Sequence, residues 1–328
     1  MLYPMKLKAP LKDYLWGGTR LKDEYGKVTD LDKVAESWEL SCHKDGLSVI
    51  ANGEYAGKTL AAYIEAQGSV VLGTAAAAFT YFPLLIKLID AKDNLSVQVH
   101  PDNDYALRVE HEYGKTEMWY IVDAEPGASL IYGFKHEISP EKFAESIKNN
   151  TLLDYCNQVP VKKGDVFFIE AGTLHAIGKG ILICEIQQNS NTTYRVYDYG
   201  RVGADGKPRA LHTEKAMEVT RLAPATYPIG PKLQPDIFGH GNKLDLLADC
   251  EYFTVFRLSL QNDFDLAVGS DSFQSITVLD GVLTLKTARD ELSAQKGETL
   301  FLPANLGDYR LSGKADLIIG KVGKNKDE

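Results

Sequence analysis

The chain has 328 residues, of which 44% are hydrophobic and 25% are charged, as in ordinary globular proteins. It carries 45 Asp and Glu residues against 36 Lys and Arg residues, which gives a formal net charge of −9. Small disulfide scaffolds, disordered tails and membrane-spanning chains are excluded by this length and composition. Because the basic residues are scattered, we expect neither nucleic acid nor a membrane as a partner, and no protein partner is evident. An anionic ligand would need a local binding site.

The four cysteines lie far apart in the sequence and form no Cys-x-x-Cys pair. This spacing predicts reduced, mostly buried thiols and disfavours a zinc knuckle or a redox dithiol. The N-terminal residues lack the basic and apolar regions of a secretory signal, so we expect a cytoplasmic protein.

Four short helices are predicted from residues that favour helix N-termini. Thr59 caps a helix that ends near Gly68, Asp102 opens a second, Ser139 opens a third and Thr213 opens a fourth. These helices are expected to pack on a β scaffold.

Short β-rich runs separated by turn residues make up most of the remaining chain. Strands are predicted at 84–89, 95–99, 118–122, 129–132, 166–169 and 181–187, and again at 253–260, 275–279, 282–286, 299–302 and 317–322. Most neighbouring runs are too close in sequence for a helix to intervene, so antiparallel pairing is favoured.

A weak internal repeat links the two halves of the chain. Residues 164–175 align with 297–308, since each segment reads as a turn of Gly and an acidic residue, an apolar strand and a corner of small residues. Upstream, residues 117–123 align with 274–280. The pattern resembles a mainly β fold of two cupin-type jelly-roll barrels with a few packing helices.

Prolines and glycines accumulate between the two copies, so we expect a catalytic cupin domain at 1–235 and a degenerate cupin-like β domain at 236–328. The second copy is called degenerate because Glu117 is replaced by Gln274 and His175 by Asp308.

Four polar residues of the first copy are candidate metal ligands. Gln98 and His100 share one strand face by the period of two, while Glu117 begins another strand and His175 stands at a corner. Taken alone, each residue is better explained as a hydrogen-bonded or solvated strand end or corner. Together they offer an amide oxygen, a carboxylate and two imidazoles, which favours a catalytic zinc site with an open position.

A polar stretch at 185–201 follows. Arg195 lies among tyrosines, where a guanidinium can clamp a phosphate or stabilise an anionic intermediate, and Glu185 could face the same cavity. For the stretch as a whole, a solvated turn is the default explanation.

Seven segments, taken in order, resemble the type I mannose-6-phosphate isomerases in their short bacterial form. They are 14–18, 36–39, 83–87, 95–101, 114–120, 171–176 and 191–195. Seven ordered matches are far more specific than any one of them. The resemblance implies a cupin fold and a zinc-dependent aldose-ketose isomerase that interconverts mannose 6-phosphate and fructose 6-phosphate through an enediol.

The resemblance also implies roles for individual residues. The zinc ligands, for one Zn²⁺ per chain, would be Gln98, His100, Glu117 and His175. The catalytic arginine would be Arg195, the conserved pocket acid Glu185, and the groups that bind the sugar phosphate Lys87, Ser96 and Lys115.

One position departs from the family pattern. Longer members carry a His immediately before the pocket lysine, whereas this chain has Gly114. The proton-transfer base therefore cannot be that side chain, and Glu185 or a zinc-bound water is the candidate.

Two other hypotheses stay open at this point. An iron-dependent cupin enzyme such as an oxygenase would use two His and one carboxylate, which His100, Glu117 and His175 also provide. A sugar-binding protein with a vestigial site is the other, and ligand binding without turnover would favour it.

Overall fold

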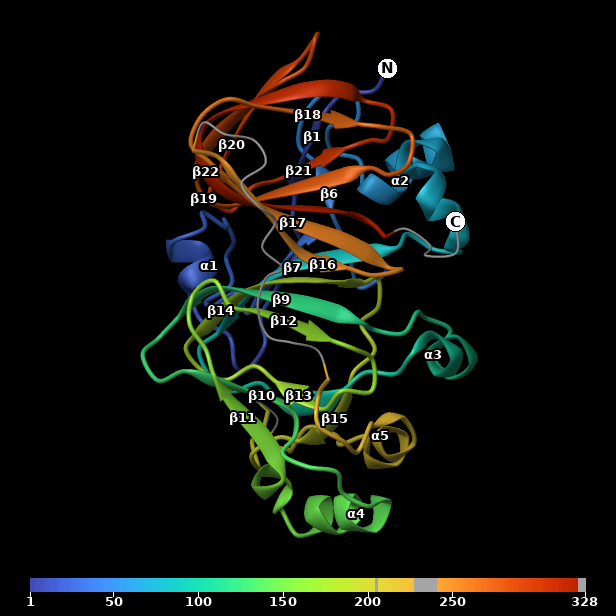
Figure 1. The fold of residues 1–328 in the computed structure, drawn as a ribbon, viewed down its shortest axis with the longest axis vertical. Helices are drawn as coiled ribbons and strands as arrows, with labels where there is room; N and C mark the ends of the chain where they lie inside the picture. Colours follow the sequence, from blue (N-terminus) through green and yellow to red (C-terminus); the bar gives the residue numbers. More distant parts are fainter. Residues whose placement is uncertain (204–205, 227–240, 324–328) are drawn as a thin grey trace.

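The computed structural model describes residues 1–203, 206–226 and 241–323. Its architecture is mainly β, as predicted, with sheets of six, five and nine strands and a small hairpin of β4 (Cys42–His43) and β5 (Gly46–Leu47). Figure 1 shows the three large sheets stacked along the long axis, with the nine-stranded sheet at the top, the six-stranded sheet in the middle and the five-stranded sheet below.

The six-stranded and five-stranded sheets face each other and are built from the first half of the chain. In order across the six-stranded sheet lie β12 (Val166–Ile169), β9 (Glu117–Ala124), β14 (Ile181–Gln188), β7 (Leu84–Ala91), β3 (Glu36–Leu40) and β2 (Leu11–Lys12). The five-stranded sheet has the order β11 (Cys156–Pro160), β10 (Ser129–Phe134), β13 (His175–Ala176), β8 (Val97–Val99) and β15 (Tyr194–Tyr197). Their strand pairs are antiparallel, as the short connections predict.

The nine-stranded sheet takes most of its strands from the second half. Its order is β16 (Lys243–Asp249), β17 (Phe253–Leu260), β22 (Gly307–Val322), β19 (Gln274–Lys286), β21 (Thr299–Leu302), β1 (Met5–Lys8) and β6 (Val49–Ile50), with β18 (Phe264–Val268) on β22 and β20 (Glu291–Gln295) on β19. The runs predicted at 275–279 and 282–286 are one strand, β19, whose pairing shifts register between Val278 and Asp280. An irregularity of this kind bends a strand without ending it, so two separate strands was the wrong prediction.

The predicted N-terminal domain also contributes to this sheet. Met5 pairs with Phe301 and Leu7 with Ile50, so β1 joins the C-terminal strands to β6. The predicted boundary between residues 235 and 236 lies outside the described residues.

The helices are α1 (Arg20–Asp23), α2 (Leu60–Gln67), α3 (Asn103–Val109), α4 (Pro140–Lys148) and α5 (Thr213–Val219), with 3₁₀ turns at Ser69–Leu72, Thr74–Ala78 and Leu152–Asp154. Three helices, α2, α3 and α4, begin where the capping residues predict, whereas α1 was not predicted. The side chains of Thr59, Asp102 and Ser139 accept backbone N–H bonds in the first turns of α2, α3 and α4. In α5, Thr213 is already helical and makes no cap, since the N-cap position is His212.

The internal repeat is reproduced in the strand register. Glu117 pairs with Ile169 in the first copy, and Gln274 pairs with Leu302 at the aligned positions of the second. The backbone pairing is therefore the same in both copies, and the difference between them lies in the side chains.

The six-stranded sheet is buried on both faces. Met118 on β9 belongs to a core shared with Phe253 and Phe301 of the nine-stranded sheet. The next residue, Trp119, belongs to a core between the six-stranded and five-stranded sheets. Because successive side chains point to opposite faces, one set of strands joins the two halves of the molecule.

The described chain offers no helix with the length and apolar character needed to cross a membrane. All four cysteines are free thiols, and Cys156 and Cys184 are buried. The prediction of unpaired cysteines is confirmed.

The shared core predicts that the two halves unfold together. Phe301 is fully buried and its ring contacts those of Tyr63 and Phe273. We expect Phe301→Ala to lower the free energy of unfolding by about 3 to 5 kcal/mol in one cooperative transition, measured by urea denaturation. The control Val282→Ala, at an exposed position of β19, should change it by less than about 0.5 kcal/mol. Two separate transitions in the Phe301 variant would contradict a shared core.

Candidate active site

The predicted site residues converge between the six-stranded and five-stranded sheets. Glu117 on β9, Lys87 on β7 and Glu185 on β14 come from the six-stranded sheet, where Glu185 pairs with Lys87. From the five-stranded sheet, Gln98 on β8 pairs with His175 on one side and with Arg195 on the other. The antiparallel register therefore places these residues side by side in space, although Gln98 and Arg195 are almost a hundred residues apart in sequence.

A group of three buried residues can hold a metal ion. Donor atoms of His100, Glu117 and His175 all lie within 4.8 Å of one another, and it is the one such group in the described part of the chain. The Glu117 Oε1 atom is buried and has no hydrogen-bond partner. An unpaired carboxylate oxygen beside two imidazole nitrogens matches the donor set of a catalytic zinc site.

Both imidazoles are oriented by the backbone. His100 Nδ1 lies 2.9 Å from the Thr192 carbonyl oxygen, and His175 Nδ1 lies 2.8 Å from the Thr173 carbonyl oxygen. These contacts place the ring proton on Nδ1 and leave Nε2 as a lone pair facing the group. Burial lowers the pKa of His175 to about 4 and also lowers the pKa of His100, so both rings are neutral ligands at physiological pH.

Gln98 stands beside this group, on the strand face predicted for it. Its amide nitrogen lies 3.4 Å from His175 Nε2, and its oxygen lies 3.5 Å from the Ser96 hydroxyl. Rotation of the terminal amide would exchange the nitrogen and the oxygen. The side chain is thus placed to present its oxygen to an ion held by the other three residues.

Two lysines are embedded among carboxylates next to the group. The Lys115 ammonium contacts Glu117 and lies 3.3 Å from His100 Nε2 and 3.5 Å from Glu185. The Lys87 ammonium lies 3.4 Å from Glu185 and 3.5 Å from Glu36. Burial opposes the charge of Lys87, but the two carboxylates outweigh it and raise the Lys87 pKa.

Glu185 is held as a carboxylate. Its Oε2 accepts a hydrogen bond of 2.8 Å from the Trp119 indole N–H, and its Oε1 faces the two lysines. Burial favours the neutral acid, but Lys115 and Lys87 outweigh it and lower the Glu185 pKa. Burial and the nearby Glu185 raise the pKa of Glu117 instead. The two acids thus differ: the lysines favour the ionised form of Glu185, whereas Glu117 contacts Lys115 through one oxygen and keeps the other, Oε1, without a partner.

A cavity of about 270 Å³ opens over the group. The predicted residues that line it are Lys87, Ser96, Gln98, Lys115, Glu185 and Arg195. The other three, His100, Glu117 and His175, adjoin Lys115 and Gln98 by the contacts above. All nine predicted residues are therefore in one place.

Sequence reasoning assigned no role to several other lining residues. Tyr14, Trp16 and Glu36 line the cavity and lie within segments that carried the family resemblance. Their place in those segments could have marked them as candidate site residues. Arg209 also lines the cavity. It lies beyond the matched segments, so no motif pointed to it.

Arg195 reaches the cavity from β15. Its Nη1 donates a 2.9 Å hydrogen bond to the Ala210 carbonyl oxygen, while its buried Nε has no partner. Burial and the nearby Arg209 charge lower the Arg195 pKa. A guanidinium with an unused donor and a like-charged neighbour is poised for an anion.

Gly114 occupies the position where longer family members carry His. A Cβ atom added there would lie 2.4 Å from the Asp102 carbonyl carbon and 2.5 Å from the Asn103 nitrogen. This backbone at the start of α3 leaves no room for a side chain at position 114.

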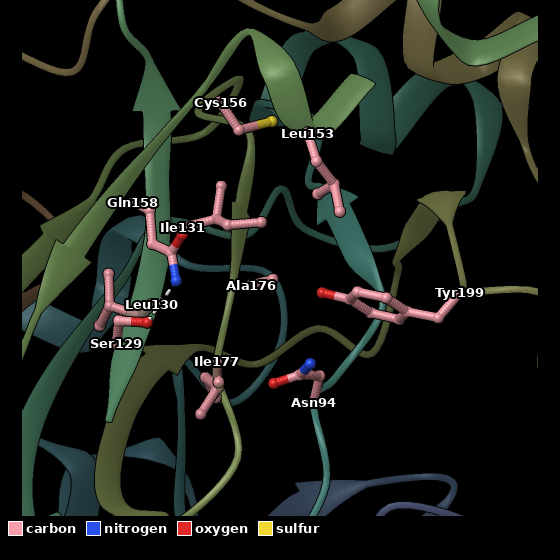
Figure 2. A pocket seen from close by; sticks show the side chains of 11 residues that line it. Asn94, Ser129, Leu130, Ile131, Leu153, Cys156, Gln158, Ala176, Ile177 and Tyr199 are labelled. Atoms are coloured by element: carbon pink, nitrogen blue, oxygen red, sulfur yellow. Dashed lines mark hydrogen bonds between the residues drawn. The ribbon is translucent and has the colours of Figure 1, made fainter. Parts of the chain in front are cut away.

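A second cavity, of about 150 Å³, is shown in Figure 2. Its wall includes Ile131, Leu153, Cys156 and the ring of Tyr199. Lys, Arg, Asp, Glu and His are absent from its lining, so the chemistry is assigned to the cavity over the metal-ligand group.

Comparison with known proteins agrees with this geometry. Residues 4–126 match the family described as phosphomannose isomerase type I, catalytic domain, and residues 242–322 match the mannose-6-phosphate isomerase cupin domain. A mannose-6-phosphate isomerase of Streptococcus mutans is 36% identical over 321 residues, which span 97% of this chain and 98% of the relative. The chain belongs to the type I phosphomannose isomerase family. Family membership makes it an isomerase with a cupin domain.

Solved structures show the same fold. The mannose 6-phosphate isomerase of Bacillus subtilis has a TM-score of 0.88 at 34% identity, covering 97% of this chain and 99% of that one. A mannose 6-phosphate isomerase solved with zinc bound has a TM-score of 0.78 at 17% identity, covering 98% and 100% of the two chains. The predicted mainly β fold is confirmed.

The ligand group predicts how metal binding responds to substitution. His175→Asn removes one imidazole from a fully buried group, and we expect at least about a tenfold loss of zinc affinity, measured by competition with a chromogenic chelator. The control His136→Asn changes an exposed imidazole outside the group and should leave affinity unchanged. Equal affinity in both variants would place the metal elsewhere.

Proposed function

We propose that this protein interconverts mannose 6-phosphate and fructose 6-phosphate, with one zinc ion per chain held by Gln98, His100, Glu117 and His175. The observation that carries the proposal is the buried His100, Glu117 and His175 group beside the cavity in a member of this family. The relatives named above supply the substrate and the reaction.

The reaction moves a proton between C2 and C1 of the sugar. Removal of the C2 proton of the aldose with protonation of O1 gives an enediol, and protonation at C1 with loss of the O2 proton gives the ketose. Zinc, when bound, would supply Lewis-acid stabilisation of the negative charge that develops on O1 and O2. Arg195 adds a fixed positive charge in the wall of the same cavity, where partial exclusion of water strengthens its effect.

Glu185 is our candidate for the base. It is ionised, lines the cavity and faces Lys115, which in turn contacts Glu117. Lys87, Ser96 and Lys115 lie on the same wall and would hold the sugar oxygens so that C1 and C2 meet the base.

A cytoplasmic location stays part of the proposal. Four free thiols are consistent with a reducing compartment.

The test is a coupled assay of mannose 6-phosphate conversion to fructose 6-phosphate on purified protein, before and after chelation and with zinc restored. We expect activity to disappear with the chelator and to return with zinc, because the proposed reaction needs zinc at the ligand group. If chelation leaves the activity unchanged, the isomerase reaction would stand but the metal would have no part in it. Metal-loaded protein without activity would overturn the proposed reaction.

The role of Glu185 can be separated from structural effects by a matched pair. Glu36, like Glu185, accepts an indole N–H bond, from Trp38 at 2.7 Å, and lies beside Lys87. If Glu185 is the base, Glu185→Gln should lower kcat by about a hundredfold or more, whereas Glu36→Gln should lower it much less. Steady-state kinetics on zinc-loaded variants with matched melting temperatures is the measurement. Equal losses in the two variants would exclude Glu185 as the base.

A further inference from the structure

The loop between β14 and β15, residues 189–193, orients one of the metal-ligand side chains. Its Thr192 carbonyl oxygen lies 2.9 Å from His100 Nδ1, while Asn191 and Thr193 line the cavity. The direction of the Nδ1–H bond fixes the plane of the imidazole, and with it the direction in which Nε2 faces the other ligands. The place of the Thr192 carbonyl therefore decides how well His100 can bind an ion.

The backbone of this loop is held by side chains. The Asn191 N–H donates to Glu112 Oε2 at 3.4 Å, and the Thr192 N–H donates to the Ser190 hydroxyl at 3.2 Å. The Thr192 hydroxyl donates a further bond, of 3.3 Å, to the same oxygen of Glu112. Two successive residues of the loop thus depend on one carboxylate oxygen, and the second of them carries the carbonyl that orients His100.

The other oxygen of Glu112 is fixed by the β4–β5 hairpin. The Lys44 ammonium lies 2.6 Å from Glu112 Oε1, and the buried His43 places its Nε2 at 3.4 Å. Because His43 Nδ1 accepts the Asp45 N–H at 3.1 Å, the ring proton is on Nε2 and faces Glu112. Lys44 and His43 lower the pKa of Glu112 although burial opposes them, so the side chain is a carboxylate.

The chain around Glu112 is anchored as well. It turns at His111, whose φ is 57°, and the next residue after Glu112, Tyr113, is buried. Two residues further on, the Lys115 N–H donates to the Pro101 carbonyl oxygen at 3.0 Å. Glu112 therefore stands on a fixed backbone between α3 and β9, as a group that positions another must.

We propose that Glu112 is a positioning residue of the metal centre, which holds the Thr192 carbonyl where it orients His100. The inference deepens the proposed function and rests on it, because it concerns how one proposed zinc ligand is held. Glu112 acts through Thr192, so its loss would change the direction of the His100 ring and leave the set of ligands intact.

The experiment compares Glu112→Ala with Glu110→Ala. Glu110 is a matched control, because it also accepts a bond from a hydroxyl near β15, that of Tyr194 at 2.7 Å, and one from a lysine, Lys215 at 2.6 Å. For Glu112→Ala we expect the dissociation constant for zinc to rise by about threefold to tenfold, less than on loss of a ligand. For Glu110→Ala it should stay within about twofold of the wild type. Competition with a chromogenic chelator measures both, on variants with matched melting temperatures.

A proton NMR spectrum of the zinc-loaded protein separates positioning from general loosening. The Nδ1–H protons of His100 and His175 exchange slowly with water while they are bonded to the carbonyls of Thr192 and Thr173. We expect Glu112→Ala to broaden or remove the His100 signal and to leave the His175 signal in place. The His175→Asn variant identifies which signal is which. Loss of both signals, or of neither, would overturn the inference.

A double variant tests whether the effect passes through Thr192. Thr192→Val removes the hydroxyl that bonds Glu112 and keeps the carbonyl. Since both changes break the same contact, Thr192→Val should weaken zinc binding by less than about twofold when it is added to Glu112→Ala. Losses that multiply in the double variant would contradict this route.

Failure of this inference is distinguishable from failure of the proposed function, because zinc affinity and the NMR signals need no turnover. A wild type that binds zinc and does not isomerise the sugar would reject the proposed reaction, while the role of Glu112 would still stand on these two measurements. An active wild type whose zinc affinity and His100 signal are unchanged by Glu112→Ala would reject the role of Glu112 alone.

Discussion

The burial of charge between two sheets is the constraint on which the rest of this structure depends. Removing carboxylates and ammonium groups from water costs several kcal/mol per ion unless each finds partners. Lys87 and Lys115 are the ion-pair partners of Glu36, Glu185 and one oxygen of Glu117. The second oxygen of Glu117 has no donor, and it lies where two neutral imidazoles point their lone pairs. A cation bound there would supply the partner that this oxygen lacks.

The six-stranded sheet gives this arrangement its rigidity. Its strands are buried on both faces, so the side chains that point into the site are backed by those that pack against the nine-stranded sheet. Glu185 and Cys184 are adjacent in β14 and serve these two different faces. A shift of one residue in register would turn each side chain to the opposite face, and the packing of both cores opposes that shift.

The second copy of the repeat has the same strand pairing as the first but lacks its metal-ligand residues. Gln274, at the position of Glu117, donates to the Ala267 carbonyl oxygen and accepts from the Tyr309 hydroxyl, so its polar atoms are used locally. Asp308, at the position of His175, is exposed on β22. The nine-stranded sheet instead supports the first copy, because its Phe253 and Phe301 pack in a core shared with the six-stranded sheet.

The sequence by itself indicated the runs that form strands such as β7, β9, β14 and β17, three helix starts, the repeat and nine candidate site residues, because apolar periodicity, capping residues and ordered motifs are local properties of the chain. It did not indicate β3, β15 or β16. It erred where an irregularity joined two predicted strands into β19, and it gave no sign that Met5 pairs with Phe301. Only the tertiary structure decided how each cation is paired. Lys115 and Arg209 are both basic residues in the printed sequence, yet Lys115 lies between two carboxylates, Glu117 and Glu185, whereas Arg209 shares the Asp198 carboxylate with a second guanidinium. Charge compensation depends on distances across strands, and no pattern along the chain encodes those distances directly.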